Sequence, residues 1–295
     1  MTKKTSIHTQ SLEIPKIILL TSKLLSFTSP KLITLFAARL FVTPIKYKIP
    51  KRESEMDRNS LQKSIRIPGI EKEVVVYEYG KSEKKILLVH GWSGRGTQLF
   101  KIADELVKAG YSTISFDAPA HGKSPGKYTI MVDFIAAILE LEKQFGPFEA
   151  AIGHSLGGMS VLNSIKKGLK VHHAVVIGSG DIVQDVMDDF VEKLELKPNI
   201  STLLRLHFEK KYGEKMNNYS AFLAAKETNI PVLVIHDNDD PEVPVKAGIN
   251  IGGTSPLPLP KEIRSLDNYS PGLAITLEGN ATKWFDEKKK WGLTL

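Results

Sequence analysis

The sequence predicts an α/β fold in which a mostly parallel sheet carries helices on both faces. Short apolar runs of strand length alternate along the chain with amphipathic segments of helix length. Such continuous apolar runs are typical of parallel strands that are covered on both sides. One junction between a strand and a helix carries the sequence G-x-S-x-G, at residues 153–157. With 295 residues, of which 42% are hydrophobic, the chain is large enough to bury a full core.

The strands and helices are expected in a regular order. Two alternating runs, at 64–68 and 74–79, predict a hairpin joined through Gly69. Apolar runs predict further strands at 85–90, 111–116, 148–152, 173–177 and 231–236. Periodic segments predict helices at 98–109, 129–145 and 156–167. Glycine follows the first two of these helices, as it does at many helix ends.

The N-terminal segment 14–41 is the most apolar part of the sequence. Charged residues and a proline interrupt it, at Lys16, Lys23, Pro30, Lys31 and Arg39. No uninterrupted run reaches the roughly 20 residues that a membrane span requires, and no clear signal-peptide cleavage site follows. The pattern predicts two amphipathic helices that meet at Ser29 and Pro30, with Pro30 opening the second. Their apolar faces either pack on the protein or make peripheral contact with a membrane surface.

We therefore divide the chain into two parts. Residues 1–57 comprise the two helices and a basic, proline-containing connector at 43–57. Residues 58–295 form the α/β domain, in which polar helical segments at about 181–228 interrupt the alternation as an inserted lid. From about residue 250 onward the sequence departs from the alternating pattern.

The charge and the cysteine content exclude some partners and some kinds of site. The 40 basic and 33 acidic residues give a net charge of +7, and the basic excess lies mostly near the two ends. No basic block is interleaved with aromatic residues, so we expect no nucleic-acid partner. The sequence contains no cysteine, which excludes disulfides, thiolate chemistry and cysteine metal sites. It fits a reducing compartment, and a cytoplasmic location, with membrane association left open, is therefore expected.

Ser155 stands at the centre of the G-x-S-x-G sequence. A serine on a sharp strand-to-helix turn adopts a strained backbone conformation, and the turn closes only when Gly153 and Gly157 lack Cβ atoms. Such a nucleophile elbow presents the hydroxyl above the sheet, at the positive end of a helix, where a developing oxyanion is stabilised. The alternative is a glycine-rich junction that only packs closely.

Four sequence blocks follow one another in a specific order. They are His90-Gly91-Trp92, residues 116–124 (FDAPAHGKS), residues 153–158 (GHSLGG) and residues 231–244 (PVLVIHDNDDPEVP). In this order the blocks resemble the α/β-hydrolase family, in its lipase/esterase and serine-aminopeptidase-like branch. The resemblance implies a three-layer α/β-hydrolase fold with a short lid insertion. It also implies a serine hydrolase that cleaves an ester, thioester or amide of a small acyl-type substrate, without a cofactor or a metal ion.

The resemblance assigns a nucleophile and an oxyanion hole. Ser155 matches the nucleophile. The backbone N–H group of Leu156, the next residue, matches one oxyanion donor, and the N–H group of Trp92 matches the second. The block at 117–124 matches a structural loop of the family, in which His121 is a hydrogen-bonded loop residue rather than a base.

The resemblance also assigns the acid of a catalytic triad. Asp240, which opens the D-x-x-V-P sequence after a strand, matches that acid. Asp237 and Asp239 lie close to it, and the alternative is that all three aspartates form turns.

The histidine of the triad is missing. The family places it after the last strand, beyond the acid, yet the histidines are at 8, 90, 121, 154, 172, 173, 207 and 236. Residues 273–277 could form the last strand, with Asn280 or Thr282 in the position of the histidine. Neither side chain titrates near neutral pH, so neither can accept the proton of the serine. The segment 251–272 also lacks the amphipathic helix expected before that strand.

Other histidines are candidate bases. His207 lies in the inserted lid, whereas His90 and His236 stand at strand ends near the rim of the site. Each of them has an ordinary structural explanation as well. His154 is expected to pack away from the face on which the serine attacks.

Three functional hypotheses follow. The first is a serine esterase-like hydrolase whose activity is impaired by the missing histidine. The second is a hydrolase-like protein that binds a small molecule and turns it over slowly or not at all. The third is a membrane-surface protein in which the N-terminal helices are the functional part. The atypical end of the sequence is either a divergent native end or the product of an altered reading of the gene.

Overall fold

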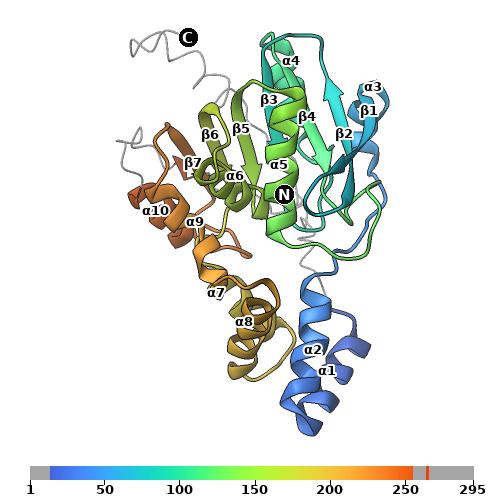
Figure 1. Cartoon of the computed structure of the whole chain (residues 1–295), viewed down its shortest axis with the longest axis vertical. Helices are drawn as coiled ribbons and strands as arrows, with labels where there is room; N and C mark the ends of the chain where they lie inside the picture. Colours follow the sequence, from blue (N-terminus) through green and yellow to red (C-terminus); the bar gives the residue numbers. More distant parts are fainter. Residues whose placement is uncertain (1–13, 255–263, 266–295) are drawn as a thin grey trace, which may run out of the picture.

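The computed structural model describes residues 14–254 and 264–265. Within them, eight strands form one sheet in the order β1-β2-β4-β3-β5-β6-β7-β8 (Figure 1). The strands are β1 (Leu61–Ile67), β2 (Lys72–Tyr79), β3 (Lys85–Val89), β4 (Ser112–Asp117), β5 (Phe148–His154), β6 (Val171–Ile177), β7 (Val232–His236) and β8 (Arg264–Ser265). β2 runs antiparallel to β1 and β4, and all other neighbours are parallel. The prediction of a mostly parallel sheet is confirmed.

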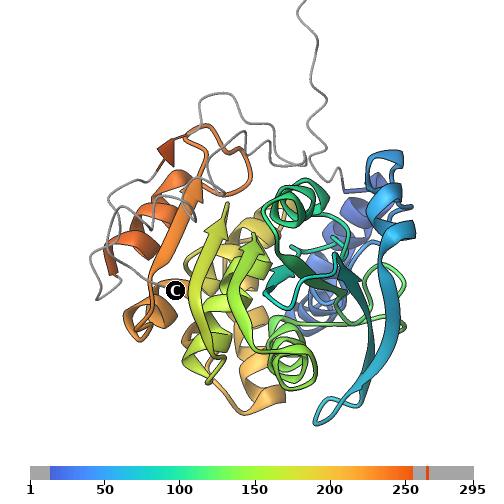
Figure 2. The same ribbon diagram turned by 90° about the horizontal axis from the view of Figure 1, so that it is seen from above.

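Helices cover both faces of this sheet (Figure 2). One face packs against α5, α6, α9 and α10, and the other packs against α4. These helices are α4 (Phe100–Lys108), α5 (Met131–Phe145), α6 (Leu156–Lys166), α9 (Ala221–Lys226) and α10 (Val245–Thr254). The three-layer arrangement expected from the sequence is therefore present.

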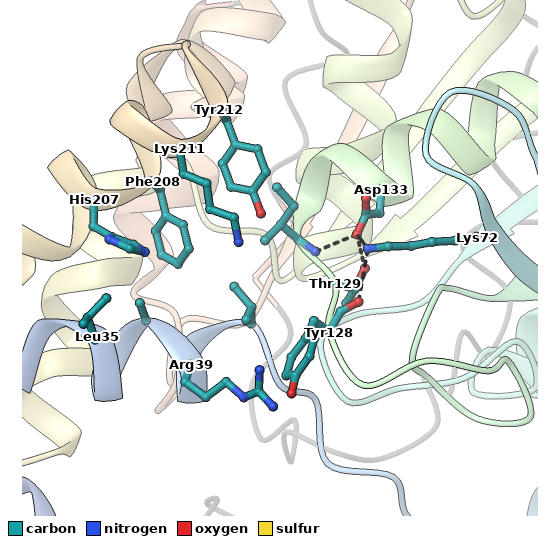
Figure 3. Close-up of a pocket in the computed structure, with 13 residues that line it drawn as sticks. Leu35, Arg39, Lys72, Tyr128, Thr129, Asp133, His207, Phe208, Lys211 and Tyr212 are labelled. Atoms are coloured by element: carbon teal, nitrogen blue, oxygen red, sulfur yellow. Dashed lines mark hydrogen bonds and ion pairs between the residues drawn. The ribbon is translucent and has the colours of Figure 1, made fainter. Parts of the chain in front are cut away.

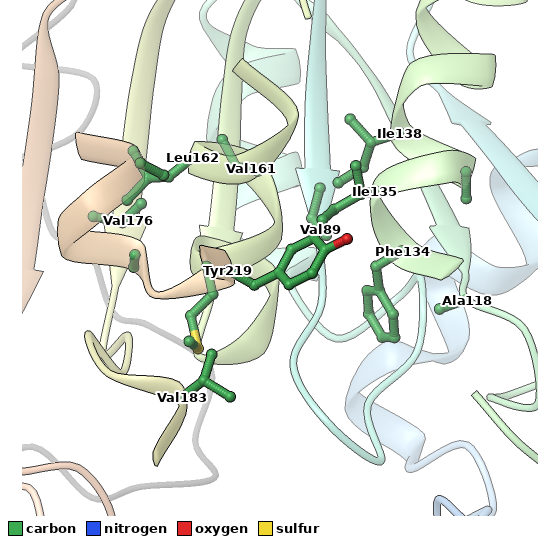
Figure 4. Close-up of a cluster of buried hydrophobic side chains, with 14 of the residues drawn as sticks. Val89, Ala118, Phe134, Ile135, Ile138, Val161, Leu162, Val176, Val183 and Tyr219 are labelled. Carbon is green, nitrogen blue, oxygen red and sulfur yellow. The ribbon is translucent and has the colours of Figure 1, made fainter. Parts of the chain in front are cut away.

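Alternate residues of the central strands enter two different cores. Val89 of β3 packs in the core that contains α5, together with Ile135 and Ile138 (Figure 4). Ile86 and Leu88 of the same strand pack in the core that contains α4. Because successive side chains of a strand point to opposite faces, a strand that is apolar at every position can fill both cores.

The chain between β6 and β7 is helical. It contains α7 (Val183–Lys193), α8 (Asn199–Tyr212) and the 3-10 helix η2 (Met216–Tyr219), which precede α9. Figure 1 shows α7 and α8 beyond the carboxyl ends of the parallel strands. This is the edge of a parallel sheet at which ligands bind in open α/β folds.

The two N-terminal helices form as predicted. α1 spans Lys16–Thr28 and α2 spans Pro30–Phe41, with the Ser29 hydroxyl accepting a hydrogen bond from the backbone N–H of Leu32 at 3.5 Å. α2 packs against α8 (Figure 1), and the ring of Phe41 also lies 5.1 Å from a phenylalanine ring of α7. α2 therefore packs on the protein, whereas α1 leaves large apolar side chains exposed. No helix of the described residues is long and apolar enough to cross a bilayer.

The connector at 43–57 is more ordered than its composition suggested. It contains the 3-10 helix η1 (Lys51–Glu53) and the start of α3 (Ser54–Asn59). Glu53 is buried, and its carboxylate accepts hydrogen bonds from Arg95 at 3.1 Å and from Thr97 at 2.8 Å. This buried ion pair fixes the connector to the loop that follows β3.

A helix that the sequence analysis did not predict, α10, lies between β7 and β8, and it packs against β7. Of the segment 251–272, in which no amphipathic helix was expected, the structure describes only 251–254, which end α10, and 264–265, which form β8. The glycines of α10 obscured it in the sequence, because glycine has a low helix propensity. The packing explains one of them: a Cβ atom at Gly248 would lie 2.8 Å from Nδ1 of His236. The strand expected at 273–277 and the positions of Asn280 and Thr282 lie outside the described residues.

Candidate active site

Ser155 lies on the turn between β5 and α6 with a strained backbone. Its φ of 52° and ψ of −121° fall in a region that residues with a side chain rarely adopt. A Cβ atom at Gly157 would lie 2.3 Å from the carbonyl oxygen of Val89, and one at Gly153 would lie 2.4 Å from the carbonyl oxygen of Gly157. The two glycines are therefore required for the turn to close, as the sequence predicted.

The loop after β3 approaches the serine closely. A Cβ atom at Gly91 would lie 3.1 Å from Cβ of Ser155. Trp92 is the next residue, and Leu156 opens α6 directly after the serine. Within residues 14–254 the structure gives no hydrogen-bond partner to the backbone N–H of either Trp92 or Leu156. Two free amides thus lie in segments next to Ser155, that of Leu156 in the chain and that of Trp92 in the loop that approaches the serine.

Hydrogen bonds to three side chains fix this loop to the loop after β4. Asp117 accepts from the backbone N–H of Gly96 at 2.6 Å. His121 Nε2 accepts from the backbone N–H of Ser93 at 3.0 Å. His90 Nε2 accepts from the backbone N–H of Ala118, also at 3.0 Å. The position of Trp92 is therefore set by neighbours on both sides of it in the chain.

The two histidines of this network are held neutral. Burial lowers the pKa of His121 to about 4 and lowers the pKa of His90 well below its usual value. Since Nε2 accepts in each ring, the proton is on Nδ1, and it is donated to the carbonyl oxygens of Pro119 at 3.1 Å and Gly91 at 2.6 Å. Neither ring has a nitrogen left for proton transfer, so both histidines are structural. This agrees with the expectation for His121.

Asp240 lies after β7 and is held by its own turn. Oδ1 accepts from the backbone N–H of Glu242 at 2.8 Å and from that of Val243 at 3.0 Å. Oδ2 is 3.9 Å from Nε2 of His236, which is hydrogen-bonded to the carbonyl oxygen of Val243 at 2.8 Å. The turn-forming role that was kept as an alternative therefore applies to Asp240, and it leaves Oδ2 without a hydrogen bond among the described residues.

The structure brings Asp240 near the turn that carries Ser155. A Cβ atom at Gly178 would lie 3.5 Å from Oδ2 of Asp240 and 3.9 Å from Nε2 of His154. His154 is half-buried, and its buried Nδ1 atom has no hydrogen-bond partner in the described part of the chain. Burial lowers the pKa of His154, and the negative charge of Asp240 partly opposes that effect.

The described residues place no imidazole on the hydroxyl of Ser155. No hydrogen bond to its Oγ is formed within residues 14–254. His207 lies on α8 at a cavity formed with α2, and His236 is used by the loop after β7. Ser155 thus lies close to the segments that carry the two amides, while the described residues bring no proton acceptor to it.

Sequence comparison identifies the domain. Residues 86–227 match the profile of the alpha/beta hydrolase family. This part of the chain, slightly less than half of its length, is similar to the alpha/beta hydrolase family. The match starts in β3 and ends after α9, so it covers the elbow and the helical insertion and stops before Asp240. No curated protein has a significant sequence match to the chain.

Solved structures with the same fold are named for different enzymatic reactions. An esterase from Pyrococcus furiosus has a TM-score of 0.61 and 17% identity, covering 85% of this chain and 95% of its own. An N-acyl homoserine lactonase has a TM-score of 0.58 and 16% identity, covering 80% of this chain and 99% of its own. A bromoperoxidase from Bacillus anthracis has a TM-score of 0.52 and 18% identity, covering 78% and 99%. At such identities the likeness establishes the α/β-hydrolase fold and leaves the substrate to be argued from the site.

Two relations in the alpha/beta hydrolase site were not predicted. One is the approach of Asp240 to His154, which depends on the paths of two loops. The other is the use of His90 as an acceptor for Ala118, for which the only signal was a histidine directly after a buried strand. Both depend on contacts between segments that are far apart in the sequence.

The neutral state of His121 predicts an acid-sensitive loop. Its pKa is about 4 in the folded protein and about 6.5 when unfolded. Its contribution to stability is therefore full above pH 6.5 and is lost as the pH falls toward 4, where unfolding takes up a proton. Glutamine accepts a hydrogen bond without titrating. Over this pH range the free energy of unfolding of His121→Gln should therefore fall by about 2 to 3 kcal/mol less than that of the wild type.

The measurement is urea unfolding of the wild type and of His121→Gln between pH 7.5 and pH 4.5. The difference between the two free energies of unfolding is the relevant quantity, because Asp117 titrates in both proteins and its pKa is raised by burial. Parallel pH profiles for the two proteins would show that His121 is not held neutral by the fold.

Proposed function

We propose that this protein is a serine hydrolase that cleaves an ester, thioester or amide of a small acyl-type substrate. The observation that carries the proposal is the left-handed backbone of Ser155 beside the free amides of Leu156 and Trp92. This arrangement is that of a nucleophile on an elbow next to an oxyanion hole. The similarity of residues 86–227 to the alpha/beta hydrolase family supports it.

The reaction follows from these groups. The Ser155 oxygen attacks the carbonyl carbon of the substrate, and the carbonyl oxygen becomes an oxyanion that accepts hydrogen bonds from Leu156 and Trp92. Collapse of this intermediate expels the leaving group and forms an acyl-serine. Water then hydrolyses the acyl-serine and restores the hydroxyl. Because the described residues bring no imidazole to Ser155, the serine proton passes to solvent, and the reaction is slow.

A second candidate is a binding protein that uses the same groups around Ser155. The observation that favours it is the sequence after Asp240, which contains no histidine. In a serine hydrolase, loss of the base leaves roughly 10³–10⁴-fold acceleration over water from the oxyanion hole and from binding. A ligand can therefore be held and polarised with little turnover. The two candidates differ in whether an acyl-serine forms.

Addition of imidazole should raise the rate of ester hydrolysis. Imidazole in solution can accept the proton of a half-buried hydroxyl, so it replaces the missing base. We expect a saturable increase in p-nitrophenyl ester turnover and faster labelling by a fluorophosphonate probe. Both effects should be absent in Ser155→Ala and retained in Ser160→Ala, whose hydroxyl donates only to the carbonyl oxygen of Leu156.

Turnover that survives Ser155→Ala, after subtraction of the reaction of free imidazole, would overturn the proposed mechanism. Absence of probe labelling and of a product burst, with or without imidazole, would instead favour the binding protein.

Asp240→Asn tests whether any triad operates. The acid of a triad orients the histidine and stabilises the imidazolium, and its amide variant loses about 10⁴-fold in kcat where a histidine is present. Since no imidazole meets Ser155 in the described residues, we expect a change of less than about tenfold in kcat for the ester. A loss near the full triad effect would reveal a histidine that works with Asp240.

A further inference from the structure

A cavity of about 210 Å³ lies between α2, the loop that leads into α5, and α8 (Figure 3). Ser155, Trp92 and Asp240 are not among the residues that line it. The cavity is therefore distinct from the candidate active site. Its walls come from the N-terminal helices, the core domain and the helical insertion, so it exists only because these three parts pack together.

Two cations point into this cavity. The guanidinium carbon of Arg39 lies 3.5 Å from the ring centroid of Tyr128. Stacking on a ring uses the flat face of the guanidinium and leaves its N–H edges free to donate. Lys211 extends from α8 toward the same space (Figure 3). Neither Arg39 nor Lys211 has a carboxylate within ion-pair distance among residues 14–254.

The carboxylate in the cavity does not balance these charges. Asp133 lines the wall, but its Oδ2 accepts from Lys72 at 2.5 Å, from the Thr129 hydroxyl at 3.0 Å and from the backbone N–H of Ile130 at 3.2 Å. Lys72 thus neutralises Asp133. The charges of Arg39 and Lys211 remain, so the cavity is electrostatically suited to an anion.

The remaining wall is apolar. Leu35 and Ala38 of α2, Val42 directly after it and Phe208 of α8 all line the cavity. A ligand that fills it would place a hydrocarbon part against these side chains and a charged end against Arg39 and Lys211 (Figure 3). Few polar groups at defined positions in an apolar lining are typical of small-molecule sites.

We propose that this cavity binds a small amphiphilic anion, in which a carboxylate or phosphate group is joined to a short aliphatic chain. Arg39 holds the head group through its N–H edge, with Tyr128 keeping the guanidinium in place. Lys211 contributes a second charge from the insertion and so links α8 to α2 through the ligand. The proposal does not depend on hydrolase activity, because none of its residues belongs to the candidate active site.

Calorimetric titration of the full chain tests this site, with hexanoate, hexyl phosphate, inorganic phosphate and hexanol as probes. Hexanoate or hexyl phosphate should bind, and the comparison of the two identifies the head group. Inorganic phosphate and hexanol should each bind at least about tenfold more weakly, since each lacks one of the two features. Binding should persist in Ser155→Ala.

Variants that each lack one positive charge test the roles of Arg39 and Lys211. Arg39→Gln and Lys211→Gln should each weaken binding by about tenfold or more, the size expected for a lost charge-assisted hydrogen bond. Lys210→Gln is the control, because this exposed lysine is the neighbour of Lys211 and does not line the cavity. A melting curve equal to that of the wild type shows that a variant is folded, and Lys211→Gln, at an exposed position, is expected to meet this condition.

Failure of both hexanoate and hexyl phosphate to bind at millimolar concentration would overturn the proposal. Equal binding of hexanol would show that no anion is recognised. An equal loss in Lys210→Gln would show that only the general surface charge matters.

A separate observation concerns the outer face of α1. Ile17, Leu20, Leu24 and Phe27 follow at spacings of three and four residues, and they are 64–81% exposed. On the other side of the helix, Ile18 and Leu25 pack against the hydrophobic core around the buried Ser22. A helix that is apolar on its exposed face as well as its buried one requires a further apolar partner.

The positive charges near this apolar face indicate the nature of the partner. Lys16 and Lys23 are exposed on α1 and Lys31 is exposed at the start of α2, within a chain of net charge +7. Figure 1 shows α1 at the end of the molecule away from the sheet, where a flat surface can reach it. We infer that α1 lies on an anionic lipid surface, with its apolar stripe in the headgroup boundary and its lysines among the phosphates.

Vesicle co-sedimentation tests this inference. The wild type should bind vesicles of phosphatidylglycerol more tightly than vesicles of phosphatidylcholine, and Leu20→Glu combined with Phe27→Glu should abolish binding. Leu61→Glu is the control, because Leu61 is 58% exposed on strand β1 in the α/β domain. Lys16→Gln with Lys23→Gln should weaken binding to the anionic vesicles alone. Absence of vesicle binding, with dimers that the double glutamate variant dissociates, would assign the face to a second copy and overturn the inference.

Discussion

The close approach of helix α6 to strand β3 is the constraint on which the site depends. The carbonyl oxygen of Val89 occupies space that any side chain at Gly157 would need. With the helix seated this close to the sheet, the chain can leave β5 only through a tight turn, and Ser155 takes the left-handed conformation of that turn. The backbone amide of Leu156 is left without a partner for the same reason, since it opens the helix. The strained serine and its first donor are therefore one feature of the packing.

The second donor depends on buried acceptors in the loop after β4. Asp117 and His121 accept from backbone amides of the loop that carries Trp92, and the neutral state of the imidazole makes this possible. A site built in this way is ready to stabilise negative charge before any substrate arrives. Proton transfer is a separate task, and the described residues do not bring a base to Ser155. In the function that we propose, oxyanion binding and base catalysis thus depend on different groups.

Sequence patterns predicted the features that depend on local periodicity. They did not predict the features that form where distant segments of the chain meet. The strands followed from continuous apolar runs, and the elbow followed from two glycines around Ser155. α10 was missed because close packing against His236 requires glycine at position 248, and glycine weakens the helical signal. The nearness of Asp240 to His154 and the cavity at Arg39 have no local signature, because each is formed by side chains from elements that meet only in the folded chain.

α2 belongs to one of the two proposed binding regions and adjoins the other. Neither region includes residues of the candidate active site. The inner side of α2 faces α8 and supplies Arg39 to the cavity, while its neighbour α1 presents the exposed apolar stripe. The elbow, by contrast, depends on contacts among β3, β5 and α6. In the function that we propose, loss of a catalytic base lowers the rate of bond cleavage without changing the contacts of Arg39, Lys211 or α1. The proposed ligand binding and surface binding use residues that the proposed reaction does not, so both are compatible with weak hydrolase activity.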